Sequence, residues 1–192
     1  MKKSLLLALA LFFTTVVFAQ SRAIHLRETF DSTSLPEGWT TTETGAANWV
    51  ISETNNAGGE ANELMLSPTP QAAGITRIIT KPIDLTGMSS VTISFRHYFK
   101  KKSTSAIVGV ATSANGSTWS SAWTHTYSEE GQYTVIENIS NADMGKQNVM
   151  FCIYFQGSTS NINGWYFDDF EIVTTENNDA KVESIDMHPI LP

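Results

Sequence analysis

The sequence predicts an all-β protein folded as a two-sheet antiparallel sandwich, and three observations lead to this fold class. Beyond the first 19 residues, helical spacing of apolar residues is nearly absent. Short runs rich in Thr, Val, Ile, Phe, Tyr and Trp instead alternate with Gly, Asn, Ser and Pro, the pattern of strands and turns. In the run that begins at Val91, apolar Val91, Ile93 and Phe95 share one face. The number and spacing of such runs favour a jelly roll.

These runs place the individual strands. We expect strands at Ala23–Phe30, Trp49–Ser52, Glu63–Leu66, Ile75–Ile79, Ser90–Tyr98, Ala106–Ser113, Trp119–Tyr127, Tyr133–Ile139, Asn148–Gln156 and Trp165–Val173. The segment Ala114–Ser117 predicts a hairpin turn, because its Asn-Gly pair readily takes positive φ.

The N-terminus has the pattern of a secretory signal peptide over residues 1–19. Lys2 and Lys3 precede an apolar run, Leu5–Phe18, and small Ala19 marks the cleavage site. The run is shorter than the about 20 residues that a membrane span needs, so we expect no transmembrane segment in the mature chain. The sequence therefore predicts a protein that is secreted or displayed at the cell surface.

The domain organisation follows from the same pass along the chain. We expect residues 20–174 to form one jelly-roll domain and residues 175–192 to be a linker followed by a new alternating run, Ala180–Ile185. That run has the pattern of a first strand. The chain is thus consistent with a fragment of a polypeptide that contains further domains.

Composition excludes some partners and some means of stabilisation. The chain has 12 basic and 19 acidic residues, a net charge of −7, so we expect no nucleic-acid partner. The single cysteine, Cys152, lies in an apolar run and is interpreted as a buried, inert thiol. Because one cysteine cannot form an intramolecular disulfide, stability must come from a large core or a bound metal.

No common catalytic motif is present, so the sequence predicts a protein that is not an enzyme. Gly-x-Ser-x-Gly, His-Glu-x-x-His and Cys-x-x-Cys are all missing. The histidines, His25, His97, His125 and His188, have no metal-ligand spacing. A glycosidase pair would need a second acid in an aromatic cleft, which the sequence does not indicate.

Two carboxylates are candidate metal ligands. Strand alternation puts Asp168 on the face of Phe170, and Glu28 on the face of Phe30. An ionised carboxylate among apolar groups is costly unless it is paired or bound to a cation. If the first and last strands are neighbours, the two acids could meet.

Calcium suits such a site because it takes six to eight oxygen ligands, which include carboxylates, carbonyls and amides. We therefore expect a structural Ca²⁺ held by Glu28, Asp168 and Asn62, the last from the polar loop at residues 55–62. The alternative pairs Asp168 with Arg27, Arg96 or backbone amides, and the sequence leaves both open.

An aromatic stripe is a candidate ligand-binding surface. Trp119, Trp123 and Tyr127 fall at even spacing in one predicted strand. If exposed, they would form a platform for stacking sugars; if buried, they belong to the core, where large aromatic side chains are common.

Several segments together resemble the cleaved-adhesin and choice-of-anchor J domains of secreted bacterial proteins. The resemblance rests on the order and spacing of Phe30–Ser32, Leu35–Trp39, Asn48–Trp49, Asn62–Pro68, Ile83–Thr86, Val91–Phe95, Ser113–Trp119 and Gly164–Ile172. It covers the chain from about Arg27 to Val173.

This resemblance implies a jelly roll similar to MAM and carbohydrate-binding modules, often with structural Ca²⁺ and often beside peptidases, as in gingipain-type proteases. Asp168 matches the aspartate before the closing hydrophobic pair, and Glu28 matches the acid before the first phenylalanine. The chain departs from relatives with an Asp-rich calcium loop, because residues 40–45 contain one acid, Glu43.

The function predicted at this point is a non-catalytic adhesion or ligand-recognition module, stabilised by calcium, with an extracellular glycan or protein as its partner. The alternative is a carbohydrate-binding module that serves a secreted peptidase or glycoside hydrolase.

Overall fold

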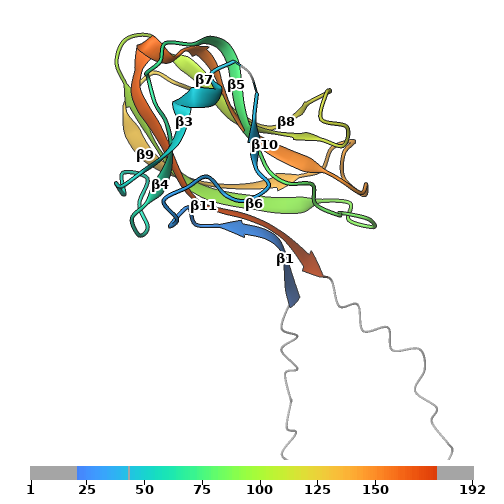
Figure 1. Ribbon diagram of the computed structural model, residues 1–192. Helices are drawn as coiled ribbons and strands as arrows, with labels where there is room; N and C mark the ends of the chain where they lie inside the picture. The colour runs from blue at the N-terminus through green and yellow to red at the C-terminus, as the bar shows by residue number, and fades with distance from the viewer. Residues whose placement is uncertain (1–20, 43, 177–192) are drawn as a thin grey trace, which may run out of the picture.

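The computed structural model describes residues 21–42 and 44–176 and is built from strands (Figure 1). Every predicted strand is present, with ends that differ by up to three residues. The strands are β1 (Ser21–Glu28), β2 (Thr40–Thr41), β3 (Trp49–Ser52), β4 (Glu63–Leu66), β5 (Ala73–Ile79), β6 (Val91–Lys101), β7 (Ala106–Ser113), β8 (Ser120–Tyr127), β9 (Gly131–Ile139), β10 (Met150–Ser158) and β11 (Ile162–Glu176). Two 3-10 turns, η1 (Ala46–Asn48) and η2 (Thr159–Asn161), lie between strands. Within the described ranges, no helix is long and apolar enough to cross a membrane.

The strands form two antiparallel sheets that face each other (Figure 1). The six-stranded sheet has the order β3-β4-β11-β6-β9, with β1 also paired to β11; the five-stranded sheet has the order β2-β5-β10-β7-β8. From β4 onward the chain switches between sheets at almost every connection, as in a jelly roll. The predicted all-β jelly-roll sandwich is therefore confirmed.

The last strand extends further than the sequence pattern indicates. β11 runs to Glu176, and its end pairs with β1, where Thr175 lies opposite Arg22. Further back, the same strand pairs with β4 through Trp165–Phe167. The first and last strands of the described domain therefore lie side by side, and the last strand also pairs with β4. The predicted signal peptide and the predicted following strand lie outside the described residues.

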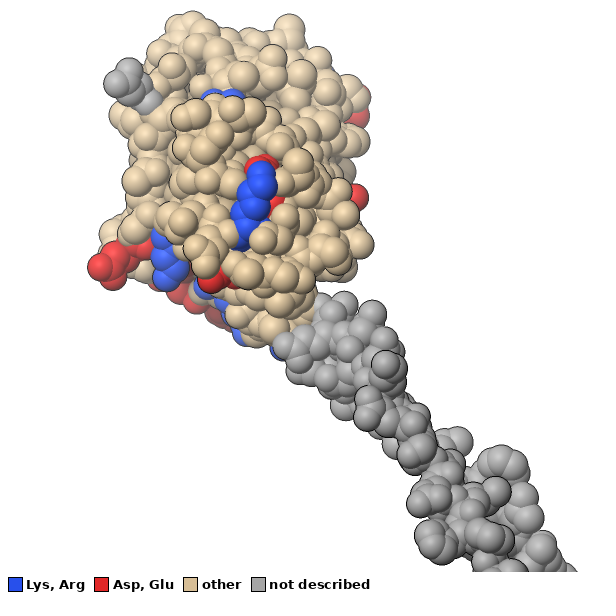
Figure 2. Space-filling model, turned by 90° about the vertical axis from the view of Figure 1, so that its right-hand side faces the viewer, with Lys and Arg blue, Asp and Glu red and all other residues tan. Residues whose placement is uncertain are grey.

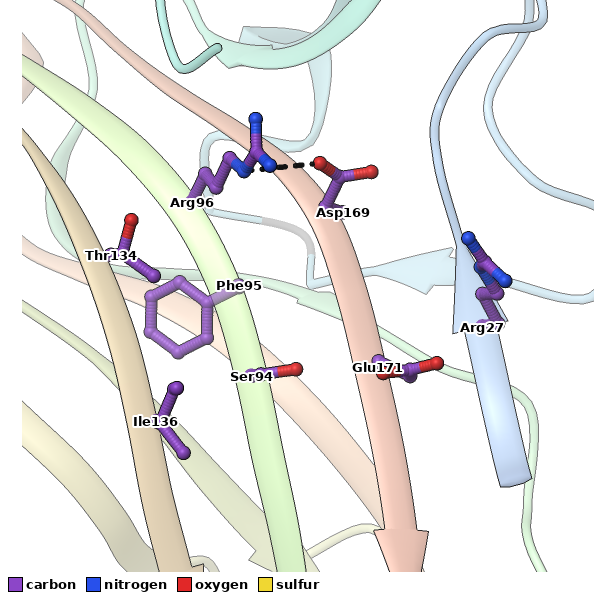
Figure 3. Close-up of a pocket in the computed structure, with 8 residues that line it drawn as sticks. All are labelled: Arg27, Ser94, Phe95, Arg96, Thr134, Ile136, Asp169 and Glu171. Atoms are coloured by element: carbon purple, nitrogen blue, oxygen red, sulfur yellow. Dashed lines mark ion pairs between the residues drawn. The ribbon is translucent and has the colours of Figure 1, made fainter. Parts of the chain in front are cut away.

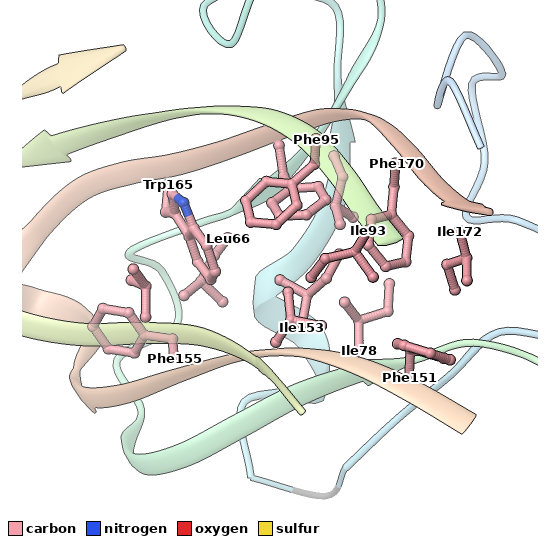
Figure 4. Packing of buried hydrophobic residues seen from close by; sticks show 14 of the residues in the cluster. Leu66, Ile78, Ile93, Phe95, Phe151, Ile153, Phe155, Trp165, Phe170 and Ile172 are labelled. Carbon is pink, nitrogen blue, oxygen red and sulfur yellow. The ribbon is translucent and has the colours of Figure 1, made fainter. Parts of the chain in front are cut away.

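Side chains from the two inner faces fill the space between the sheets (Figure 4). Phe95 and Trp165 come from the six-stranded sheet, and Phe151 and Ile153 approach them from the five-stranded sheet. Phe95 also stacks on Phe167 with ring centroids 4.5 Å apart. Each such large side chain contributes about 1.5–3 kcal/mol when fully buried. This extensive core accounts for a stable fold without a disulfide.

Candidate functional site

Asp168 lies on the outer face of the six-stranded sheet, which corrects the expectation that it shares a face with Phe170. The register of β11 against β6 shifts after the pair Asp168–Arg96, and Asp169 adopts a left-handed φ of 52°. This bulge adds a residue to β11 and inverts the alternation that follows it. Phe167 and Phe170 consequently both reach the core, while Asp168 stays on the side of Arg96.

The loop between β3 and β4 covers Asp168 and leaves it only 1% exposed. Gly59 of this loop lies directly against the carboxylate: a Cβ at this position would be 2.5 Å from Asp168 Oδ2, and its φ is +108°. Both facts require glycine here. The side chain of Asn62 fastens the end of the loop by donating to the carbonyl of Asp31 at 2.9 Å.

A second buried carboxylate, Glu63, organises the same loop. Its Oε1 accepts hydrogen bonds from the Thr54 hydroxyl and from the backbone and side-chain nitrogens of Asn56, and its Oε2 accepts from the Ala57 backbone. Sequence reasoning did not single out Glu63. The available signal was an acid that opens an apolar strand directly after a polar, Gly-containing loop.

Electrostatics make the ionised form of Asp168 unfavourable in the protein alone. Burial, with added repulsion from Asp169, Asp31 and Glu63, raises the pKa of Asp168 to about 7, although a hydrogen bond from the Asp169 backbone opposes the shift. Asp168 Oδ2 is buried and has no hydrogen-bond partner. A buried carboxylate oxygen without a partner, surrounded by other acids, is a place where a bound cation would relieve a cost.

The chemistry of these residues fits a hard cation such as Ca²⁺. Asp168 offers a carboxylate, Asp31 and Asp169 add negative charge that raises its pKa, and Asn62 has an amide oxygen on a side chain whose nitrogen donates to the Asp31 carbonyl. In the described part of the chain, no three His, Cys, Asp or Glu side chains are placed to hold a metal ion by themselves. Backbone and amide oxygens would therefore have to complete the ligand set.

Glu28, the other predicted ligand, has a different environment. Its Oε1 accepts a hydrogen bond from the Phe30 backbone at 2.8 Å. Its side chain lines a groove with Trp39 and Lys81, and it is not among the acids that raise the pKa of Asp168. The geometry thus groups Asp31 and Asp169, rather than Glu28, with Asp168.

A groove of about 290 Å³ crosses the outer face of the six-stranded sheet from β1 to β9 (Figure 3). Three of its four charged groups, Arg96, Asp169 and Glu171, form ion pairs, and Arg27 forms none with the described residues. Arg96 Nε lies 3.3 Å from Asp169 Oδ2, and Glu171 forms an ion pair with Arg22. Arg96, considered above as a partner of Asp168, is therefore paired with its neighbour. A ligand in this groove would have to compete with these ion pairs.

The three aromatic residues of the predicted stripe do not lie on one face. The register of β8 against β7 shifts at Ala122, because Trp123 pairs with Val110 whereas Ser121 pairs with Ala111. This bulge turns Trp123 toward the core, where its ring contacts Phe95 edge-on at 5.1 Å between centroids.

Tyr127 follows Trp123 into the interior. It is 6% exposed, and its ring stacks on Phe99 at 5.5 Å between centroids. A single platform of Trp119, Trp123 and Tyr127 is therefore excluded by the packing, and Trp119 alone lines an outer groove.

Trp119 lines a groove of about 170 Å³ on the outer face of the five-stranded sheet, called here the Trp119 groove. The lining residues come from four neighbouring strands and the β7–β8 turn: Ile75, Arg77, Ala111, Trp119, Ser121, Tyr154 and Gln156. The predicted hairpin turn positions Trp119, since Asn115 Oδ1 accepts hydrogen bonds from the Ser117 and Thr118 backbones. Aromatic surface and hydrogen-bonding groups thus meet in one concavity.

Arg77 and Tyr154 form the centre of the Trp119 groove. They are paired across β5 and β10, and the Arg77 guanidinium lies 5.6 Å from the centroid of the Trp119 ring. The Tyr154 hydroxyl donates to Thr124 Oγ1 at 3.1 Å. Sequence reasoning missed both residues; a lone arginine inside the apolar run Ile75–Ile79 was the available signal.

Other buried titratable groups have structural partners. The Trp165 indole N–H donates to His97 Nδ1 at 3.2 Å, so His97 carries its proton on Nε2 and donates to the Tyr127 oxygen 3.0 Å away. Burial, with a smaller effect from His125, lowers the pKa of His97 to about 3. Burial also raises the pKa of the Cys152 thiol to about 12.

Surface charge is sparse on the face shown in Figure 2, where most of the surface is uncharged and charged side chains of both signs form small groups. Charged residues make up 16% of the sequence. Recognition of a charged ligand on such a surface depends on individual side chains rather than on an extended patch.

Comparison with solved structures supports the fold. The chain is similar to a cleaved adhesin domain of Lys-gingipain from Porphyromonas gingivalis, with a TM-score of 0.59 and 14% identity over 79% of this chain and 97% of that one. It is also similar to the xylan-binding CBM22-1 domain from Paenibacillus barcinonensis, with a TM-score of 0.54 and 13% identity over 80% and 96% of the two chains.

A family 22 carbohydrate-binding module of Clostridium thermocellum gives a TM-score of 0.55 at 9% identity, over 79% of this chain and 94% of that one. No protein-family model and no curated protein sequence matches the chain. The comparisons therefore establish a jelly-roll sandwich shared with adhesin and carbohydrate-binding domains.

Proposed function

We propose that this chain is a secreted or cell-surface ligand-recognition module without catalytic activity, and that it binds a glycan through the Trp119 groove. The observation that carries the proposal is an aromatic residue placed on the outside of a sheet. Trp119 is only partly buried, lies outside the core and forms a concavity with Tyr154 and Gln156. Sugar rings combine apolar C–H faces with hydroxyl groups, and binding sites for such ligands combine aromatic surface with a few polar groups.

Charge and pairing favour this groove over the one on the opposite sheet. The groove beside Arg96 has three of its four charged groups engaged in ion pairs, whereas the Trp119 groove presents an amide, hydroxyls and a guanidinium. The similarity to cleaved adhesin and xylan-binding domains supports recognition rather than catalysis. The signal-peptide pattern supports an extracellular location.

We also propose that a structural Ca²⁺ neutralises the acidic cluster of Asp168, Asp31 and Asp169. The unpartnered Asp168 Oδ2 supports this, because a cation beside it would replace the missing interaction. The metal would hold the loop at residues 53–62 against the sheet, on the face opposite the Trp119 groove. Its role would therefore be stability rather than direct contact with the glycan.

Glycan binding is tested by screening the purified secreted protein on a glycan array and measuring the affinity of each positive by calorimetry. We expect Trp119→Ala to remove binding with little loss of stability. The matched control is Ile136→Ala, which truncates a 72% exposed side chain on the other sheet and should leave binding intact. Binding that survives Trp119→Ala, or a hydrolytic activity that disappears when a single carboxylate is changed, would overturn the proposal.

A further inference from the structure

We infer that the glycan bound in the Trp119 groove carries a carboxylate, so that the ligand class is an acidic polysaccharide built from uronic acids. The inference rests on the proposed function and specifies its ligand. It depends on Arg77, the one charged residue that lines this groove.

Arg77 is held in the groove by its strand and by its neighbours. Its backbone N–H donates to the Thr42 hydroxyl at 3.0 Å, which fixes β5 against the segment that follows β2. Its guanidinium lies against the ring of Trp119 on one side and interacts with the Cys152 thiol at the base. Contact with an aromatic ring restricts the guanidinium, so little conformational freedom remains to be lost when a ligand binds.

Arg77, like Arg27, forms no ion pair with the described residues, whereas the two other arginines of the domain do. Arg22 pairs with Glu171 and Arg96 pairs with Asp169, but within residues 21–42 and 44–176 no acidic side chain pairs with Arg77. Its Nε is buried and has no hydrogen-bond partner in the described protein. An arginine has five N–H donors, and without an acidic partner in the described protein, the carboxylate of a ligand would supply acceptors for the donors that face the groove.

The local charge is opposite to the charge of the whole chain. The protein carries a net charge of −7, whereas the Trp119 groove is lined by one basic and no acidic residue. The negative charge of the whole protein would thus repel an anionic ligand. Only a specific contact in this groove can bind its carboxylate. A guanidinium is suited to that contact because its planar fork matches the two oxygens of a carboxylate.

The other lining groups favour a uronic acid over a simple anion. The rings of Trp119 and Tyr154 offer surface for the C–H face of a pyranose, and Gln156 and Ser121 offer hydrogen bonds to hydroxyl groups. A carboxylate on the sugar would then reach Arg77 while the ring lies on the aromatic surface. Each part of the groove has a counterpart in this one class of ligand.

The inference is tested with the secreted protein and pairs of oligosaccharides that differ only in charge. Oligogalacturonate and oligomannuronate are each compared with their fully methyl-esterified forms by calorimetry at constant calcium. We expect the acidic form of at least one pair to bind about ten- to a hundredfold more tightly, the range expected for a hydrogen bond to a charged group. The advantage should decrease with added salt.

Two variants at position 77 separate a specific contact from a structural role. Arg77→Gln should weaken binding of the acidic form about ten- to a hundredfold more than binding of the methyl ester, and so abolish the preference for the acidic form. Arg77→Lys, which keeps the charge but not the planar fork, should restore part of the preference. Circular dichroism and thermal unfolding confirm that each variant is folded before its affinity is interpreted.

The outcomes distinguish this inference from the proposed function. If the protein binds neutral glycans as tightly as acidic ones, or if Arg77→Gln weakens both forms equally, the ligand class is wrong while glycan binding stands. If no glycan of either kind binds, and an adhesive protein partner is found instead, both fail together. A preference for the acidic form that persists in Arg77→Gln would place the recognition of the carboxylate elsewhere.

Discussion

The ring of Tyr154 on β10 lies directly against Gly109, its paired residue on β7. A Cβ at position 109 would come within 2.5 Å of the ring and 2.6 Å of the Trp123 carbonyl oxygen. The absence of a side chain at Gly109 therefore sets the height of the Tyr154 ring above the sheet. The floor of the Trp119 groove depends on this contact.

We expect Gly109→Ala to destabilise the protein by about 1–3 kcal/mol, because a methyl group forces the ring and the neighbouring strand apart. Glycan affinity should decrease as well, since the displaced ring no longer forms the floor of the groove. Chemical denaturation and calorimetry measure the two effects. In a Tyr154→Ala background, the part of the stability loss that is due to the ring should disappear, and an undiminished loss would show that the backbone contact alone is responsible.

Truncation of Trp123 should destabilise the protein much more than truncation of Trp119. Trp123→Ala removes a ring that packs on Phe95 and His97, so we expect a loss of about 2–4 kcal/mol in the free energy of unfolding. Trp119→Ala removes an outer side chain and should cost less than about 1 kcal/mol. Urea unfolding of both variants checks the contrast; equal losses would contradict the separation of the two residues by the β8 bulge.

Calcium removal should lower the melting temperature of the native protein. Chelation with EDTA would leave the acidic cluster around Asp168 without a counter-charge, and loss of a bound ligand destabilises by mass action. Asp168→Asn should abolish the difference between calcium and EDTA. Asp84→Asn, at an exposed turn where Asp84 Oδ1 accepts hydrogen bonds from the backbone and hydroxyl of Thr86, is the matched control and should retain it. An unfolding curve that is the same with calcium and with EDTA would exclude a structural metal.

His97 should make stability depend on pH below its ordinary pKa. The pKa of His97 is lowered in the folded protein to about 3, so between about pH 6.5 and 3 the unfolded chain binds a proton that the folded chain does not. Stability is therefore lost as the pH falls through this range, by about 1.4 kcal/mol per pH unit. Above pH 6.5 both states are neutral at this residue, and its contribution is constant.

Asp168 contributes with the opposite sign when no metal is bound. Its pKa is raised from 3.8 to about 7 in the folded protein, so the unfolded chain ionises first and stability is lost as the pH rises through that window. The dependence of stability on pH is best measured with Asp168→Asn in EDTA. This variant lacks the contribution of Asp168 and keeps that of His97. Adding His97→Phe should remove the decrease of the unfolding free energy as the pH falls through the range between the two pKa values of His97. A decrease that persists would assign it to another titratable group.

Much of the fold could be predicted from residue patterns, and particular elements show why. Val91, Ile93 and Phe95 alternate without interruption, and all three are buried as expected. The Asn-Gly turn forms where its positive φ predicts it, with Gly116 at a φ of 73°. Strands and turns depend on local conformational preference and on burial of one face, and both are visible in a short window of sequence.

The candidate sites were less predictable because they combine distant residues. Arg77 lies on β5, Tyr154 on β10 and Trp119 in the β7–β8 turn, and they meet only after β5, β10, β7 and β8 have paired. Glu63 acts through four hydrogen bonds to its own loop, and Asp168 is buried by that loop rather than by the core. Such neighbours cannot be read from spacing along one strand.

By itself the sequence determined that the chain folds into alternating strands, where these strands lie to within three residues at each end, and that one cysteine can supply no disulfide within the domain. Only the tertiary structure decided which face Asp168, Trp119 and Trp123 occupy. The physical reason is the strict two-residue period of a strand, in which one extra residue at a bulge inverts every side chain beyond it. The bulges in β8 and β11 are set by pairing with the neighbouring strands, so the inversion exists only in the assembled sheet.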